Sequence, residues 1–100
     1  MGILDKTQRL RKETLELSSA FVEIELDLAQ TFCDIAVTAG DAAKARRNAQ
    51  NARRAFASAS KFAERIERNG RILPRSVNDK LQDMRMRLAS LGRNRQADLV

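Results

Sequence analysis

Apolar residues recur at alternating spacings of three and four along most of this chain, which is the pattern of α-helices that each present one face to a core. Only one proline and four glycines stand among the 100 residues, so little in the sequence interrupts a helix. Three glycines follow the periodic segments, at a place where a helix often ends on a left-handed residue: Gly40, Gly70 and Gly92. We therefore expect helices at about 5–39, 42–69 and 75–91.

Polar residues at the predicted helix starts support these boundaries. Asp5 and Asp41 each precede a periodic segment and are typical N-cap residues. Ser76 with Asp79 resembles a capping box at the start of the third segment. Short turns between successive helices make neighbours antiparallel.

The first predicted helix differs from the others because it carries two apolar faces. One face consists of Thr14, Leu17, Phe21, Ile24, Leu28, Thr31 and Ile35. The other consists of Leu15, Val22, Leu26, Ala29, Phe32, Cys33 and Ala36. A helix with two apolar faces needs two partners, so we expect the second helix to pack on one face and the third helix on the other.

The second and third predicted helices each carry a single apolar stripe. In the second it is mostly alanine, which lets another helix approach closely: Ala45, Ala49, Ala52, Phe56, Ala59, Ala63 and Ile66. In the third it comprises Val77, Leu81, Met84, Leu88 and Leu91. The fold predicted is an all-α antiparallel three-helix bundle with a long first helical hairpin and a shorter third helix. A chain of 100 residues forms a single domain, which we place at 1–92 with a flexible C-terminal tail at 93–100.

The third helix, at roughly 25 Å, cannot cover the first, at roughly 50 Å. If it starts beside Arg9 to Arg11 and stops near Ile24 to Leu28, the tip of the first hairpin stays open as an apolar groove. Such a groove would bind a partner helix or a second copy of the chain as a homodimer. The predicted partner-binding residues are Ala29, Phe32, Cys33, Ala36 and Val37. Alternatively, the third helix tilts or slides and covers the groove itself.

Charge is distributed unevenly along the chain. Six acids and no base occupy residues 13–40, whereas residues 41–100 hold fifteen Lys and Arg against six Asp and Glu. A basic ridge follows the second helix opposite its alanine stripe and is a candidate polyanion-binding surface: Arg46, Arg47, Arg53, Arg54, Lys61 and Arg68. The competing interpretation is a solvated helix face whose charges meet the acids of the first helix or of a neighbouring copy.

The sequence argues against an enzyme. Without histidine, the chain lacks the commonest catalytic base and metal ligand, and it has no glycine-rich phosphate loop. We expect no metal and no cofactor. Cys33, between apolar neighbours, is interpreted as a small buried hydrophobe. No run is long and apolar enough to cross a membrane, and the first residues lack the pattern of a secretory signal, so we expect a cytoplasmic protein.

A segment of the chain, roughly residues 26–91, resembles two families of helical modules. Its alanine spacing, followed by Pro74 and the pairs Lys80-Leu81 and Arg87-Leu88, is similar to the layout of microtubule-interacting-and-trafficking (MIT) domains. Ala52, Phe56 and Ala59 are spaced as in the second helix of a tetratricopeptide repeat (TPR), although Glu64 stands where that repeat expects proline. The resemblance to MIT domains implies a three-helix bundle that binds partner peptides between its helices.

Taken with the open groove, these features predict a non-enzymatic helical protein-protein interaction or adaptor module. The alternative is a basic protein that binds nucleic-acid phosphates through the ridge of the second helix.

Overall fold

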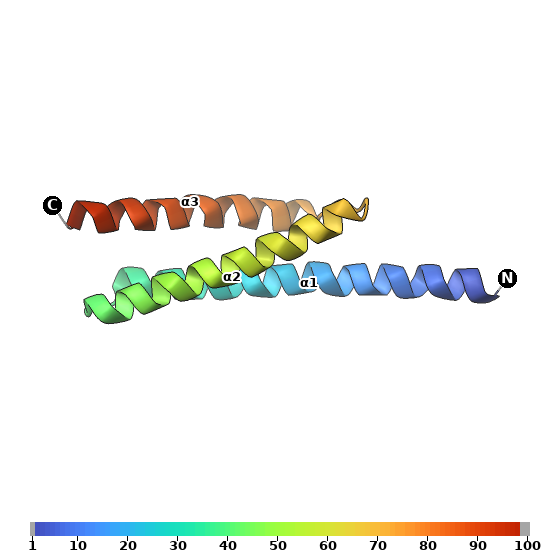
Figure 1. Cartoon of the computed structure of the whole chain (residues 1–100), viewed down its shortest axis with the longest axis horizontal. Helices are drawn as coiled ribbons and strands as arrows, with labels where there is room; N and C mark the ends of the chain where they lie inside the picture. Colours follow the sequence, from blue (N-terminus) through green and yellow to red (C-terminus); the bar gives the residue numbers. More distant parts are fainter. Residues whose placement is uncertain (1, 99–100) are drawn as a thin grey trace.

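The chain folds into three α-helices packed as a bundle, as its periodicity predicts (Figure 1). The computed structural model describes the backbone of residues 2–98 and the side chains of residues 19–92. The helices are α1 (Gly2–Thr38), α2 (Ala42–Arg68) and α3 (Arg75–Asp98). α2 runs back along α1, and α3 runs in the same direction as α1. α1 and α2 share the most extensive contact, so the first hairpin is the framework on which α3 packs.

The turn between α1 and α2 is formed by a predicted cap. Asp41 adopts an extended conformation (φ −115°, ψ 126°), and its side chain accepts a hydrogen bond from the Ala43 backbone N–H at 3.0 Å. This bond satisfies one of the donors that the first turn of a helix leaves free. Gly40 was expected to take a left-handed conformation, but its φ lies outside that region.

Helix α2 ends in a Schellman motif, and here the glycine prediction is confirmed. Gly70 has φ +78°, a conformation in which a Cβ is unfavourable. The Gly70 N–H donates to the Glu67 carbonyl at 2.9 Å, and the Arg71 N–H donates to the Ile66 carbonyl at 3.3 Å. The chain then leaves α2 through a link, residues 71–74, that is not helical.

Two helix boundaries differ from the predicted ones. α1 begins at Gly2, ahead of the predicted cap Asp5. α3 continues through Gly92 to Asp98, and so enters the segment predicted to be a tail. Gly92 is therefore a helix-interior glycine, which costs about 1 kcal/mol relative to alanine, too little to end a helix that surrounding residues favour. Ser76 lies inside the first turn of α3 and is not its cap.

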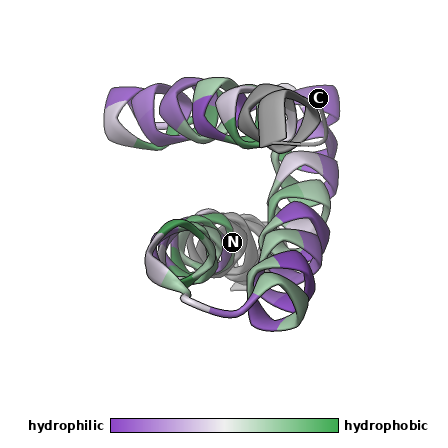
Figure 2. Cartoon of the chain, turned by 90° about the vertical axis from the view of Figure 1, so that its left-hand side faces the viewer, coloured by the Kyte–Doolittle hydropathy of each residue, from purple (hydrophilic) through white to green (hydrophobic). Residues whose placement is uncertain are grey.

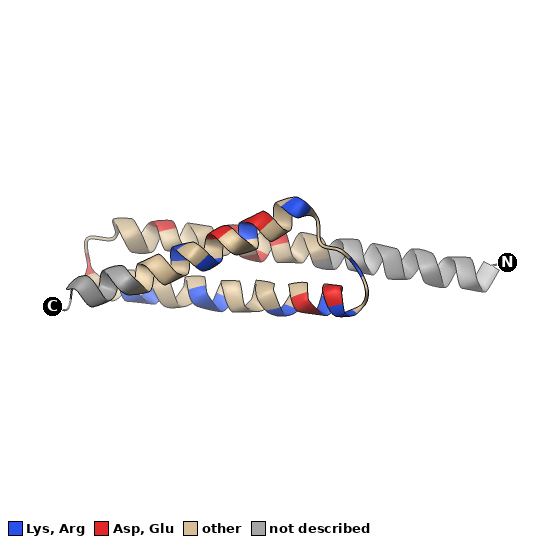
Figure 3. Ribbon diagram, turned by 90° about the horizontal axis from the view of Figure 1, so that it is seen from above, with Lys and Arg blue, Asp and Glu red and all other residues tan. Residues whose placement is uncertain are grey.

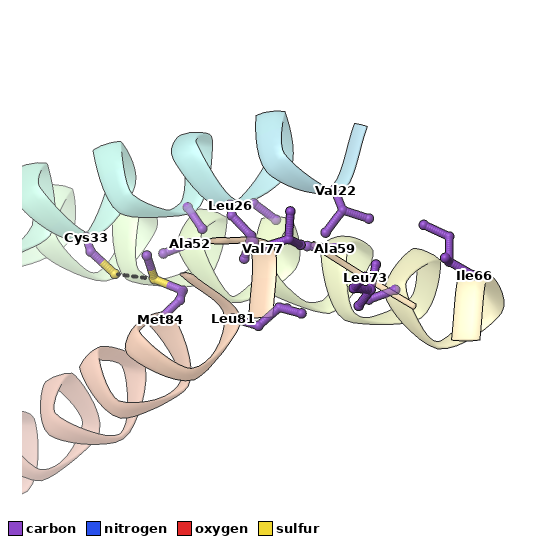
Figure 4. Packing of buried hydrophobic residues seen from close by; sticks show 13 residues of the cluster. Val22, Leu26, Cys33, Ala52, Ala59, Ile66, Leu73, Val77, Leu81 and Met84 are labelled. Atoms are coloured by element: carbon purple, nitrogen blue, oxygen red, sulfur yellow. Dashed lines mark hydrogen bonds between the residues drawn. The ribbon is translucent and has the colours of Figure 1, made fainter. Parts of the chain in front are cut away.

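The core joins the three helices along the alanine stripe of α2 (Figure 4). Val22, Leu26 and Cys33 of α1 are buried against alanines of α2, four of which belong to the cluster: Ala52, Ala55, Ala59 and Ala63. Leu73 of the link and the stripe of α3 complete it through Val77, Leu81 and Met84. Small side chains on α2 thus let larger ones from α1 and α3 fill the space between the helices.

The bundle is long, with principal extents of 66 × 18 × 17 Å. The first turns of α1 extend beyond the link that joins α2 to α3 (Figure 1). Seen along its length, the bundle shows α1 nearly end-on, while α2 and α3 are inclined to it (Figure 2). Within the described residues, no helix combines the length and the apolar character that crossing a bilayer requires.

Candidate functional site

Ion pairs between α1 and α3 show where the third helix lies along the bundle. Lys80 Nζ contacts Glu23 Oε1 at 2.9 Å and Asp27 Oδ1 at 3.2 Å, and two turns farther along Arg87 pairs with Asp34. The hydrogen bonds to Glu23 and Asp27 raise the pKa of Lys80, and the bond to Asp34 raises that of Arg87. α3 therefore lies beside the second half of α1. The prediction that it starts beside Arg9 to Arg11 is wrong.

The link explains this difference in register. Ile72 is exposed and Leu73 is buried, an alternation typical of an extended segment. Because Leu73 is buried in the core, the link returns along the bundle, and α3 begins nearer the hairpin tip than α2 ends (Figure 1). Residues Lys80 and Arg87 were not singled out as partners of α1 from the sequence. The available signal is their seven-residue separation, which matches that of Asp27 and Asp34.

The predicted groove at the hairpin tip is filled by the chain itself. Three of its five residues, Ala29, Cys33 and Ala36, are buried. Phe32 is half-buried against the core, and only Val37 is largely exposed. Cys33 Sγ donates to Met84 Sδ at 3.7 Å, which places α3 over this region (Figure 4). The structure thus corresponds to the alternative in which the third helix slides toward the tip.

The other apolar face of α1 is the one that stays uncovered. We call Phe21, Ile24, Leu28, Thr31 and Ile35 the outer seam. Ile24 is 63% exposed and Leu28 42% exposed. Phe21 and Ile35 are half-buried, and the Phe21 ring touches α2 through Phe62, with the ring centroids 4.5 Å apart. The expectation that the two faces of α1 would serve α2 and α3 separately is wrong, because core residues of the opposite face contact both helices.

A shallow hollow of about 360 Å³ lies between α1 and α3. Its apolar floor includes Leu26 and Met84, and Met86 and Gln30 lie at its margin. Lys80 and Arg87, which also line it, are the residues that pair with acids of α1. Since these cations already have partners, the hollow offers mainly apolar surface.

The basic ridge of α2 faces away from the core. Lys and Arg recur along the length of the helix (Figure 3). Five of the six predicted residues are exposed: Arg46, Arg47, Arg54, Lys61 and Arg68. Arg53 is half-buried, and its Nη2 lies 3.8 Å from where a Cβ on Gly92 of α3 would stand. Among the described side chains, the ion pairs of the α1 acids are made by α3 and not by this ridge.

The described residues do not gather three or more potential metal ligands at one place. Cys33 is buried, and this burial raises the pKa of its thiol, while Arg87 acts in the opposite direction. A thiol with a raised pKa is a weak nucleophile at neutral pH. Cys33 thus serves the packing of the core.

Comparison with known proteins identifies no relative. The sequence matches no protein-family model, and neither a characterised protein nor a solved structure gives a significant match. The resemblance to MIT and TPR modules is therefore supported only as far as an all-helical, three-helix arrangement. The outer seam of α1 and the basic ridge of α2 are the two candidate functional surfaces.

Proposed function

We propose that this chain is a non-enzymatic helical interaction module that binds a helix through the outer seam of α1. The observation that carries the proposal is the exposure of Ile24 and Leu28 on the longest helix, at the spacing of a packed stripe. Scattered apolar residues on a surface are ordinary, but a periodic stripe along a helix indicates a partner. The groove predicted at the hairpin tip is replaced as the binding surface by this seam, about a third of a turn or more around α1.

Burial of the seam would add to the energy of association. Ile and Leu side chains that pass from water into an apolar contact contribute about 1.5–3 kcal/mol each when fully buried. The neighbouring half-buried Phe21 and Ile35 would extend this contact at both ends. A partner helix laid along the seam would meet Phe21, Ile24, Leu28 and Ile35, at i, i+3, i+7 and i+14, a spacing similar to that of the anchors in helix-in-groove recognition.

Site-specific photo-crosslinking tests this function. A photoreactive amino acid at position 24 or 28, in the cells that produce the protein, is expected to give a covalent adduct. Position 86 is the matched control, because Met86 of α3 is 63% exposed, as is Ile24, but lies off the seam. Adducts of one defined mass from 24 and 28, absent from 86, would support the proposal. If positions 24 and 28 gave no more adduct than 86, the seam would not be a binding surface.

The second candidate function is binding of a nucleic acid through the basic ridge. The observation that favours it is the exposure of Arg47, Arg54, Lys61 and Arg68 at seven-residue steps. Within the part of the chain whose side chains are described, none of these four forms an ion pair. Cations without protein partners can neutralise phosphates and release the counterions that surround a nucleic acid.

The salt dependence of binding tests this second candidate. We expect Arg47→Glu with Arg54→Glu to abolish binding to a duplex DNA or RNA probe and to reduce the slope of log affinity against log salt concentration. Arg71→Glu with Arg75→Glu is the matched control, since both residues are exposed but lie outside α2. Equal losses from the two double variants would show only an effect of net charge, and the ridge would not be a binding site.

A further inference from the structure

We propose that the partner on the outer seam is a second copy of this chain, and that the two α1 helices pair antiparallel. This inference rests on the proposed function and names its partner. The first half of α1 in each copy would lie along the second half of α1 in the other, about a two-fold axis near residue 19. Such an arrangement is an isologous dimer, in which both copies use the same surface.

The spacing of the outer seam continues through the whole length of α1. Ile24 is preceded in the sequence by Leu17, Leu10 and Ile3 at exact steps of seven. Phe21, Leu28 and Ile35 form the companion series three or four residues away. The seven-residue series of Ile and Leu thus has four members, from Ile3 to Ile24, and the companion series is apolar from Phe21 to Ile35. Threonine occupies the remaining positions of the two series: Thr7, Thr14 and Thr31. α1 is one continuous helix over this range, Gly2–Thr38.

The antiparallel pairing accounts for two features of α1 at once. Its seam is exposed at Ile24 and Leu28, and its first turns extend past the rest of the bundle (Figure 1). A helical segment without tertiary packing is only marginally stable in water. With the axis near residue 19, Leu10 lies opposite Leu28 of the second copy, and Ile3 lies opposite Ile35 of the second copy. Each overhanging segment then covers the exposed part of the other seam.

Charge along α1 favours the antiparallel orientation. The first twelve residues of the chain contain four bases, Lys6, Arg9, Arg11 and Lys12, against one acid, Asp5, whereas residues 13–38 hold six acids and no base. In the antiparallel pairing, positions that flank the seam bring Arg11 beside Glu25 of the second copy. They also bring Lys6 beside Asp34 of the second copy, which already pairs with Arg87 of its own copy. A parallel pairing would instead bring Lys6 beside Arg11. One like-charge contact remains, between Glu13 and Asp27, and it is offset by the ion pair of Asp27 with Lys80.

Thr31, the polar residue of the outer seam, and Thr38, one heptad farther along α1, can be covered without loss of hydrogen bonds. The Thr31 hydroxyl donates to the Asp27 carbonyl at 3.1 Å, and the Thr38 hydroxyl donates to the Asp34 carbonyl at 2.8 Å. Since each donor is satisfied within α1, a second helix would bury no unpaired hydroxyl.

The molar mass of the purified full chain tests the proposal. Light scattering after size exclusion, with detection by refractive index because the chain has no Trp or Tyr, is expected to give twice 11.2 kDa at micromolar concentration. Ile24→Asn with Leu28→Asn should give 11.2 kDa with unchanged helicity by circular dichroism, since both residues are exposed in one copy. Met86→Asn is the control and should remain a dimer. A monomeric native chain at 100 micromolar, or a dimer that persists in the seam variant, would overturn the proposal.

A charge exchange tests the orientation. Glu25 makes no ion pair among the described side chains, so Glu25→Lys should act mainly on the dimer. Each single reversal, Glu25→Lys or Arg11→Glu, occurs twice in the dimer and should weaken association on the order of tenfold. The double variant should recover most of the loss. In a parallel dimer these positions are not neighbours, so an absence of recovery would contradict the antiparallel pairing.

The two proposals fail in different ways. A native chain that is monomeric in solution, but crosslinks from positions 24 and 28 to a protein of another mass, would overturn the dimer and leave the interaction function intact. If the chain is monomeric and the seam gives no crosslink, both proposals fail.

Discussion

Cys33 shows how much of this bundle depends on close packing at single positions. Its thiol is 2% exposed and lies against Met84 of α3. A small, polarisable side chain suits this place, because the neighbouring helix approaches closely over the alanines of α2. Burial is the largest effect on the pKa of the Cys33 thiol and raises it. Nearby charges have smaller, opposing effects: Arg87 and Arg53 lower this pKa, and Asp34 raises it.

The raised pKa of Cys33 predicts a loss of stability at alkaline pH. The folded state holds the thiol proton more tightly than the unfolded state, so its contribution to stability is complete below the unfolded pKa of about 8.5 and is lost as the pH rises toward the folded pKa. The chain has no His or Tyr whose titration would overlap.

Chemical denaturation at pH 7 and at pH 9.5 measures this effect. The native chain should lose more stability over the interval than Cys33→Ala, which has no thiol to ionise. The thiol should also react with a disulfide reagent much more slowly in the native protein than in denaturant. Equal pH dependence of the two chains would contradict the assignment.

At the scale of helices, two glycines with opposite roles give predictions of opposite sign. Gly70 ends α2 with φ +78°, so Gly70→Ala should destabilise the protein by about 1–2 kcal/mol. Gly92 lies inside α3, where an added Cβ would meet only Arg53 Nη2 at ordinary contact distance. Gly92→Ala should therefore stabilise by up to about 1 kcal/mol. Thermal unfolding of both variants tests this pair, and destabilisation by Gly92→Ala would mean that α3 ends there.

The alanine stripe of α2 sets the separation between the first two helices. Ala52 is 0% exposed and faces α1, so Ala52→Leu should force the helices apart and cost about 1–3 kcal/mol. Ala57→Leu is the matched control, because Ala57 is exposed on the same helix and leucine is a good helix former. The free energies of unfolding in urea should therefore differ between the two variants. Equal values would show that the stripe tolerates a wider spacing.

Helices and their inward faces were largely predictable from the sequence, but their register was not. The spacing of Val77, Leu81 and Met84 is enough to predict the buried face of α3, because the helix period can be read from a short stretch of sequence. The position of α3 along α1 depends instead on the link, where one buried side chain, Leu73, decides how far the chain returns. The link has only four residues, which is too few for a periodic pattern to predict its conformation. For this reason the tip groove was misplaced, and the outer seam, whose residues were all recognised, was expected to be covered.

The whole molecule is much more elongated than a compact domain with the same number of residues. The radius of gyration of its Cα atoms is 17.2 Å, whereas a compact domain of 100 residues has about 13 Å. We expect small-angle X-ray scattering of the monomeric variant Ile24→Asn with Leu28→Asn to give a value near the larger figure. A result near 13 Å would mean that the helices collapse into a globule in solution.

The link 71–74 also limits how many residues can be inserted between α2 and α3 without disturbing the packing of α3 on α1. One inserted residue in an extended segment would advance α3 by about 3.3 Å, roughly two residues of helical rise, and would carry Lys80 away from its place between Glu23 and Asp27. Two inserted residues would advance it by about 6.6 Å, close to the 5.4 Å of one helical turn, and equivalent positions would meet again. Lengthening of the link is thus compatible with the bundle only in steps of about one turn, whereas a residue added before α1 or after α3 would not change which side chains face each other within the bundle.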